Sequence, residues 1–331
     1  MFRGLISQLA HVELHSPKPS ESLEFFTNVL GLSVTEQAGG SAYLRAWGEH
    51  FHHSLVITEA AEPHLAHIAW RAAGEEELQE AVRRLEARGL GEGWHEDGAG
   101  HGPAYRYRSP GGHLHEIFWE VERYEAPNDQ QSSFPIRPQR IGATGAAVRQ
   151  IDHVTVGTPA INDDVAFWAE VFGTRFMEAA QPTADAEFPF FAAMSNNEQA
   201  HDHGLVVDPG HRGRTHHVAY WVDNPIDIFR STDIVIESGV PIEFGPAKHG
   251  HGENTYVYFR DPGSNHRVEL FSGGYRNYQP DWETRRWVGG VSETGGFEMY
   301  RSLALPASLR ELFPGGEADL PEADQITASH A

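Results

Sequence analysis

Three polar residues in the second half of the chain lie inside apolar segments that the sequence predicts to be strands. They are His153, His217 and Glu269, and each has hydrophobic residues beside it. Burying an imidazole or a carboxylate without a partner is costly, so each of these side chains needs one. Two histidines and one carboxylate are the ligands that hold non-haem Fe(II) and leave coordination positions open. The three residues therefore indicate a metal centre.

A second group of polar residues lies in the stretch GPAKHGHGENTYVYFRDPGSNHRVELFSGGY, residues 245–275. The pattern predicts two strands joined by a DPGSN turn, with His249, Tyr258 and Glu269 on or beside them. The chain has no cysteine, so a metal must be held by His, Asp or Glu side chains. His251 in the polar, Gly-rich KHGHGEN segment is expected to face solvent, and Tyr256 to pack in its strand.

The elements that position these residues recur along the chain. Each repeat begins with a strand, continues with an amphipathic helix and ends with further strands. The matching segments are 9–35 with 151–176, 64–90 with 215–240, and 104–119 with 255–271. The sequence thus predicts an α+β protein of four β-α-β-β-β modules in two tandem domains. Each domain is expected to be an incomplete mixed β-barrel flanked by helices.

Composition sets the expected boundaries of these domains. An N-terminal two-module domain is expected over residues 1–121, and a C-terminal two-module domain that contains the three candidate ligands over 149–287. Residues 122–148 are rich in Pro, Gly and polar side chains, which is typical of a linker. Residues 288–331 form a C-terminal extension with an acidic tail.

The order of the polar residues resembles that of a known family, the type I extradiol ring-cleavage dioxygenases of the vicinal oxygen chelate superfamily. The resemblance is strongest to enzymes of the catechol 2,3-dioxygenase type and covers roughly residues 5–287. His249 is followed by Val257-Tyr258, Asp261-Pro262 and Glu269, as in the family signature. Upstream of this signature, His201 lies in AHDHGLVV and His217 in RTHHVAYWV.

The resemblance implies a role for each matching residue. His153, His217 and Glu269 would be the Fe(II) ligands, with Mn(II) as the alternative metal. Strand neighbours face opposite ways, so only one of His216 and His217 can reach the metal, and the family pattern selects His217. His201 would handle protons as acid and base, His249 would donate near substrate and oxygen, and Tyr258 would bond a catecholate oxygen.

The implied reaction is the cleavage of a catechol ring beside its two hydroxyls by O2, giving a 2-hydroxymuconic semialdehyde-type product. A metal that binds catechol and O2 together supplies proximity and lowers the pKa of the catechol hydroxyl. The substrate is expected to be catechol or a simple substituted catechol. Phe244, five residues before His249, favours an uncharged substrate, whereas Arg285 and Arg286 leave an acidic one open. The chain has no strand–GxGxxG–helix unit, so no nicotinamide or flavin is expected.

The first half repeats part of the ligand pattern. His11, His67 and Glu116 match the three predicted ligands, and Tyr107 matches Tyr258. Aligning HFHHSLVI with AHDHGLVV, however, places Phe51 opposite His201, so the acid/base residue is missing. In the family the resemblance points to, the N-terminal half is a non-catalytic copy. We therefore expect one iron per chain, with the first-half trio hydrogen-bonded to one another or to solvent and the histidines at 49–54 at the surface or domain interface.

Charge and hydropathy limit the partners. The net charge of −22 disfavours nucleic acid and anionic membranes, and no stretch approaches the apolar length of a membrane span. We expect a cytoplasmic protein, and the family resemblance implies a homotetramer. Two alternatives stay open: a glyoxalase-like lyase or isomerase using another divalent ion, and a metal-free small-molecule-binding module.

Overall fold

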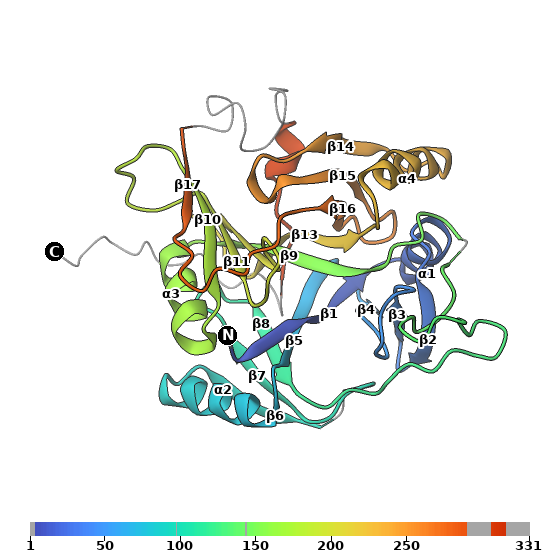
Figure 1. Cartoon of the computed structure of the whole chain (residues 1–331), viewed down its shortest axis with the longest axis horizontal. Helices are drawn as coiled ribbons and strands as arrows, with labels where there is room; N and C mark the ends of the chain where they lie inside the picture. The colour runs from blue at the N-terminus through green and yellow to red at the C-terminus, as the bar shows by residue number, and fades with distance from the viewer. Residues whose placement is uncertain (1–3, 97, 143, 290–305, 316–331) are drawn as a thin grey trace.

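Two mixed sheets, one from each half of the chain, form the structure (Figure 1). A computed structural model describes residues 4–96, 98–142, 144–289 and 306–315. Strands in the first sheet follow the order β2-β3-β4-β1-β5-β8-β7-β6, and those in the second β14-β15-β16-β13-β9-β12-β11-β10-β17. Each sheet has two different edge strands and both parallel and antiparallel pairs, so the predicted α+β fold of incomplete mixed barrels is confirmed.

The four predicted modules follow one another along the chain. The first is β1 (Ile6–Ser16), α1 (Pro19–Glu24) with a π-helical turn (Phe25–Val29), β2 (Ser33–Ala38), β3 (Ser41–Arg45) and β4 (Leu55–Glu59). The second is β5 (His64–Ala72), α2 (Glu75–Ala87), β6 (Gly91–His95), β7 (Ala104–Arg108) and β8 (Leu114–Phe118).

The second half repeats this order. The third module is β9 (Gln150–Thr158), α3 (Ile161–Phe172), β10 (Arg175–Gln181), β11 (Phe191–Ser195) and β12 (His203–Val207). The fourth is β13 (Arg214–Trp221), α4 (Pro225–Glu237), β14 (Ile242–Lys248), β15 (Asn254–Arg260) and β16 (Arg267–Gly273), after which β17 (Arg285–Val288) pairs with β10.

Local sequence explains where the helices begin and end. Asn224 and Asp227 form a capping box at the start of α4, satisfying backbone N–H groups that have no partner within the helix. Helix α3 ends at Gly173, whose φ of 73° is the left-handed conformation that glycine adopts without steric cost. The described part of 122–148 contains no helix or strand, and the domain boundaries around it stay a prediction. Among the described residues, no helix combines the length and hydropathy that a bilayer span requires.

Two helices pack on the sheet of the other half. Trp168 of α3 lies with its ring centroid 5.2 Å from that of Trp70 on β5. Phe25, directly after α1, lies 5.8 Å from Phe259 on β15, and Ser22 Oγ donates to Asp261 Oδ2 at 2.5 Å. Figure 1 shows α2 and α3 at one end of the molecule and α1 and α4 at the other. One hydrophobic core therefore draws residues from both sheets.

His203 is buried between rings from both halves in this shared core. It is fully buried, its ring lies 4.5 Å from that of Trp168 and 5.5 Å from that of Trp70, and neither ring nitrogen has a hydrogen-bond partner among the described residues. Burial, with a smaller contribution from His113, lowers the pKa of His203 to about 3. The residue is neutral in the folded protein at neutral pH.

This environment predicts acid destabilisation that depends on His203. The unfolded chain takes up a proton on this residue below its ordinary pKa of about 6.5, whereas the folded chain does so only near 3, so stability falls as the pH drops between these values. One such group contributes a slope of up to about 1.4 kcal/mol per pH unit. His203→Phe should flatten the loss of unfolding free energy between pH 6.5 and 4.5, measured by denaturant titration. The same change at the partly exposed His211 is the control, and an equal flattening there would contradict the prediction.

Candidate metal centre

The strand register brings the three predicted ligands together. Ala219 on β13 pairs with His153 on β9 on one side and with Glu269 on β16 on the other. His217 lies two residues before Ala219 and therefore shares its face of the sheet. The small side chain of Ala219 leaves the space between its larger neighbours open.

The donor atoms of this trio form a tight triangle. His153 Nε2 lies 3.0 Å from His217 Nε2 and 3.1 Å from Glu269 Oε2, and His217 Nε2 lies 3.0 Å from the same oxygen. Two donors bound at right angles by bonds of about 2.1 Å are about 3 Å apart. The spacing of the three donors therefore suits one divalent ion. Because all three residues are buried, such an ion would also give these polar groups the partner that they need.

A neighbouring carboxylate orients one of the ligands. Asp152 Oδ1 lies 2.9 Å from His153 Nδ1, which leaves Nε2 directed at the other two donors. Burial opposes a charge on His153, but Asp152 and Glu269 outweigh it and raise its pKa to about 9. Burial alone would favour a neutral Glu269; bonds from His153, His217 and His249 instead hold its pKa well below the ordinary range. The carboxylate is therefore ionised, as a metal ligand must be.

The other predicted site residues lie around the triangle. The His201 ring centroid is 4.3 Å from that of His153, and His201 Nδ1 has no hydrogen-bond partner among the described residues. His249 Nε2 lies 3.1 Å from the Tyr258 hydroxyl and 3.7 Å from Glu269 Oε1. All six predicted site residues thus form one cluster.

Two residues that the sequence left without a role also belong to this cluster. His251 is buried, with its ring 4.4 Å from that of His249, so the expectation of a solvent-facing His251 was wrong. The 3-10 turn His251–Glu253 folds this part of the chain back toward β11, where His251 lies 5.0 Å from the Phe191 ring. The Tyr256 ring stacks on that of His249 at 3.6 Å. In the sequence, His251 lies in what reads as a loop and Tyr256 in what reads as a strand, and neither pattern indicates these contacts.

Part of the C-terminal extension packs against the tyrosines of this cluster. Leu309, in the 3-10 turn Ala307–Arg310, packs against Tyr256 and Tyr258. Its carbonyl oxygen lies 2.7 Å from His216 Nε2, and buried Arg267 donates to the Ser308 carbonyl at 2.6 Å. The acidic tail from residue 316 onward lies outside the described residues.

The first half contains a counterpart that the sequence alignment placed incorrectly. Val12 pairs with Leu55, whereas the equivalent Val154 pairs with His203, so His53 and not Phe51 lies opposite His201. The expectation that the histidines at 49–54 lie at a surface or domain interface was therefore wrong for His53, whose ring is 4.4 Å from that of His11.

The predicted match of Tyr107 to Tyr258 was also wrong. Tyr258 pairs with Glu269, and the residue that pairs with Glu116 is Arg106. Tyr107 faces the other side of its strand, where its ring stacks on His115. The turn between β7 and β8 is one residue shorter than that between β15 and β16, which conceals this shift in the sequence.

Repeated modules around a buried His-His-Glu triangle are an arrangement that can hold a divalent metal ion. The family model described as "Glyoxalase/Bleomycin resistance protein/Dioxygenase superfamily" matches residues 8–117 and 150–270. The chain belongs to this superfamily.

Relatives within the superfamily cover most of the chain. A metapyrocatechase from Geobacillus stearothermophilus is 38% identical over 85% of this chain and 86% of its own. A manganese-dependent 2,3-dihydroxybiphenyl 1,2-dioxygenase from Geobacillus genomosp. 3 is 37% identical over 85% and 90%. The crystal structure of homoprotocatechuate 2,3-dioxygenase from Arthrobacter globiformis is similar with a TM-score of 0.83 and 26% identity, covering 97% of this chain and 96% of that one.

The position of Asp152 generates a prediction about metal affinity. Asp152→Asn removes the carboxylate that fixes the tautomer and orientation of His153, so affinity for a divalent ion should fall about 10- to 100-fold. Competition against a chelator under anaerobic conditions measures this. The control is Asp163→Asn, an exposed carboxylate in the first turn of α3, which should leave affinity unchanged. If the Asp152 variant and the parent protein bind the ion with equal affinity, Asp152 does not contribute to metal binding.

Proposed function

We propose that this protein is an Fe(II)-dependent extradiol dioxygenase that cleaves catechol or a simple substituted catechol with O2. The product is of the 2-hydroxymuconic semialdehyde type, and both oxygen atoms of O2 enter it. The observation that carries the proposal is the cluster of His201, His249 and Tyr258 beside the His153–His217–Glu269 triangle. The names of the relatives, metapyrocatechase and 2,3-dihydroxybiphenyl 1,2-dioxygenase, support it.

His153, His217 and Glu269 would hold the metal ion. When bound, the ion lowers the pKa of the catechol hydroxyls and holds catecholate and O2 next to each other. The three ligand side chains come from β9, β13 and β16, and catechol and O2 would reach the ion from the side that these strands leave open. Fe(II) is the proposed metal, and Mn(II) suits the same ligands; one relative is manganese-dependent by name.

His201 is suited to move protons at the open side. Burial and the neighbouring His153 and His251 keep the pKa of His201 well below its ordinary value, so its imidazole is neutral at neutral pH. A neutral imidazole accepts a proton from a substrate hydroxyl and returns it later. His201 Nδ1 has no hydrogen-bond partner in the described part of the chain, which supports this role.

Tyr258 and His249 are suited to position the substrate. Their hydrogen bond of 3.1 Å orients the Tyr258 hydroxyl, and the stacked Tyr256 ring fixes the plane of His249. If His249 Nε2–H donates to the Tyr258 oxygen, the Tyr258 hydroxyl can donate to an oxygen on which negative charge develops, and a donor held in place beforehand stabilises such charge most effectively.

An apolar wall favours an uncharged substrate. Phe244 and Leu309 pack with Tyr258, one of the residues proposed to position the substrate. The two arginines that left an acidic substrate open are engaged elsewhere: Arg285 lies over the Trp282 ring, and Arg286 donates to Gln181. A cytoplasmic homotetramer stays a prediction.

Ring cleavage is tested by adding catechol to anaerobically Fe(II)-loaded protein and then admitting air. A yellow product should form with one O2 consumed per catechol. Binding of catechol without O2 uptake would overturn the proposal and favour a binding module. Comparing catechol, 3-methylcatechol, 2,3-dihydroxybiphenyl and homoprotocatechuate then ranks substrates, and we expect the acidic homoprotocatechuate to rank last.

Substitution separates the proposed roles. His201→Gln should lower kcat about 100-fold or more, the scale of general acid–base catalysis, while metal content stays at the parental level. His153→Ala should abolish both turnover and metal binding at this site. His211→Gln is the control for loss of a histidine elsewhere. Full turnover by the His201 variant would exclude His201 as the acid/base group.

A further inference from the structure

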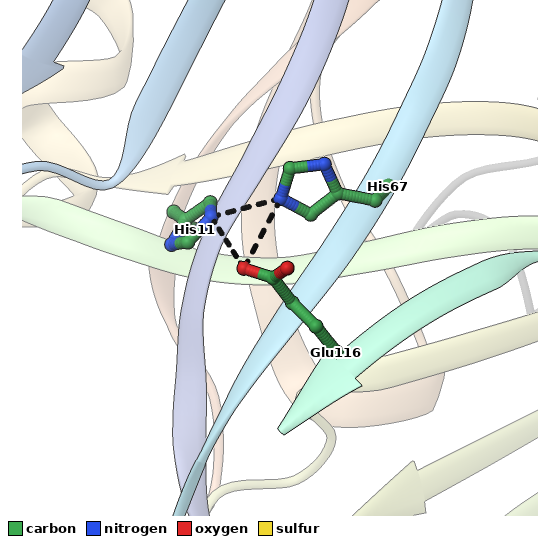
Figure 2. Close-up of side chains that lie close together, drawn as sticks. All are labelled: His11, His67 and Glu116. Atoms are coloured by element: carbon green, nitrogen blue, oxygen red, sulfur yellow. Dashed lines mark hydrogen bonds and ion pairs between the residues drawn. The ribbon is translucent and has the colours of Figure 1, made fainter. Parts of the chain in front are cut away.

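The first half of the chain contains a second triangle of donor atoms. His11 Nε2 lies 3.0 Å from His67 Nε2, and Glu116 Oε1 lies 3.4 Å from each of these nitrogens (Figure 2). The residues are 3%, 7% and 2% exposed, respectively. They come from β1, β5 and β8, and in Figure 2 the three side chains converge on one point.

The register shows that this triangle is built like the first. Ala69 on β5 pairs with His11 on one side and Glu116 on the other, as Ala219 does with His153 and Glu269. His67 precedes Ala69 by two residues, the spacing of His217 and Ala219. A small residue again leaves the space between the donors open.

A carboxylate orients one histidine here too. Glu13 Oε2 lies 2.9 Å from His67 Nδ1, and Thr58 Oγ1 donates to the other Glu13 oxygen at 2.6 Å. His67 Nε2 is thereby directed at the centre of the triangle, as His153 Nε2 is by Asp152. On the third corner, Arg106 Nε donates to Glu116 Oε2 at 3.2 Å, which leaves Oε1 facing the two histidines.

Further histidines line the open side. His53 takes the position of His201, and His101 Nε2 lies 3.5 Å from Glu116 Oε1, much as His249 lies beside Glu269. These groups border a cavity of about 220 Å³ that is also lined by Arg106 and Tyr43. An ion held by the triangle would have room for further small ligands.

We propose that the N-terminal half binds a second divalent transition-metal ion through His11, His67 and Glu116. The expected single iron per chain rested on two grounds, the family's non-catalytic N-terminal copy and a missing histidine at the position of His201; His53 fills that position and removes the second ground. Two imidazoles and one carboxylate suit Fe(II) and Mn(II) as they do in the second half. Arg106 replaces Tyr258, so the open side presents a cation where the other site presents a phenol, and this second ion would not support ring cleavage of a neutral catechol.

The ion count tests the proposal without any substrate. Anaerobic loading with excess Mn(II), desalting and elemental analysis should give two ions per chain in the parent protein. The paired substitutions His11→Ala/His67→Ala and His153→Ala/His217→Ala should each give one ion, and the fourfold variant none. His211→Gln should keep two, which excludes adsorption to exposed histidines.

A milder variant covers the case in which the paired substitutions fail to fold. Glu13→Gln should lower the affinity for the ion at the first-half triangle about 10- to 100-fold, and Asp152→Asn should lower the affinity for the other ion by a similar factor. Anomalous diffraction from Mn(II) in crystals of the parent protein should give one peak at each triangle.

One ion per chain that is lost only with His153 and His217 would overturn the proposal, as would a second ion that persists when His11 and His67 are replaced. Two ions in a protein that consumes no O2 with catechol would instead leave the second site standing and contradict the proposed ring cleavage. No bound ion would contradict both.

Discussion

The structure depends on one lateral alignment across three strands. An alanine at the centre of β13 pairs with a histidine on one neighbour and a glutamate on the other, and a second histidine two residues along completes the set. Burying these groups is costly unless each finds a partner, so the sheet register, the ionisation of Glu269 and the orientation of His153 must all be correct together. The rest of the module, including the turn at Asp261 and the hydrogen-bonded Tyr258, holds that register in place.

The two halves show how one architecture can serve different chemistry. Both have the central alanine, the triangle of donors and a carboxylate behind one histidine. They differ at the residue paired with the glutamate, which is Tyr258 in one half and Arg106 in the other. A phenol can donate a hydrogen bond to a ligand or accept one from it, whereas a guanidinium stays positively charged and attracts anions. Under the two proposals above, this single position would separate a site for a neutral diol from a site for a negatively charged ligand.

Much of this arrangement could be predicted from the sequence, because duplication places the same residue types at the same points of each module. The four modules and both sets of histidine and glutamate follow from that repeat. Positions that depend on strand register were harder. Leu55 and Leu205 match by eye, but pairing with β1 and β9 shifts one strand by two residues and brings His53 to the site. A one-residue difference in a turn moved Tyr107 to the opposite face, since strand side chains alternate. The burial of His251 depends on a non-local contact with Phe191, which no local pattern reveals.

The packing of α3 and α1 on the opposite sheets joins the two halves thermodynamically. Separating the halves would expose Trp70 and Trp168 on one side and Phe25 and Phe259 on the other, so unfolding of one sheet removes support from the second. A ligand that binds only the folded state stabilises the whole cooperative unit that contains its site. An ion held at His11, His67 and Glu116 would therefore also protect the site at His153, His217 and Glu269 from heat. An ion in the N-terminal half would thus support activity by raising the free energy of unfolding, without taking part in the reaction.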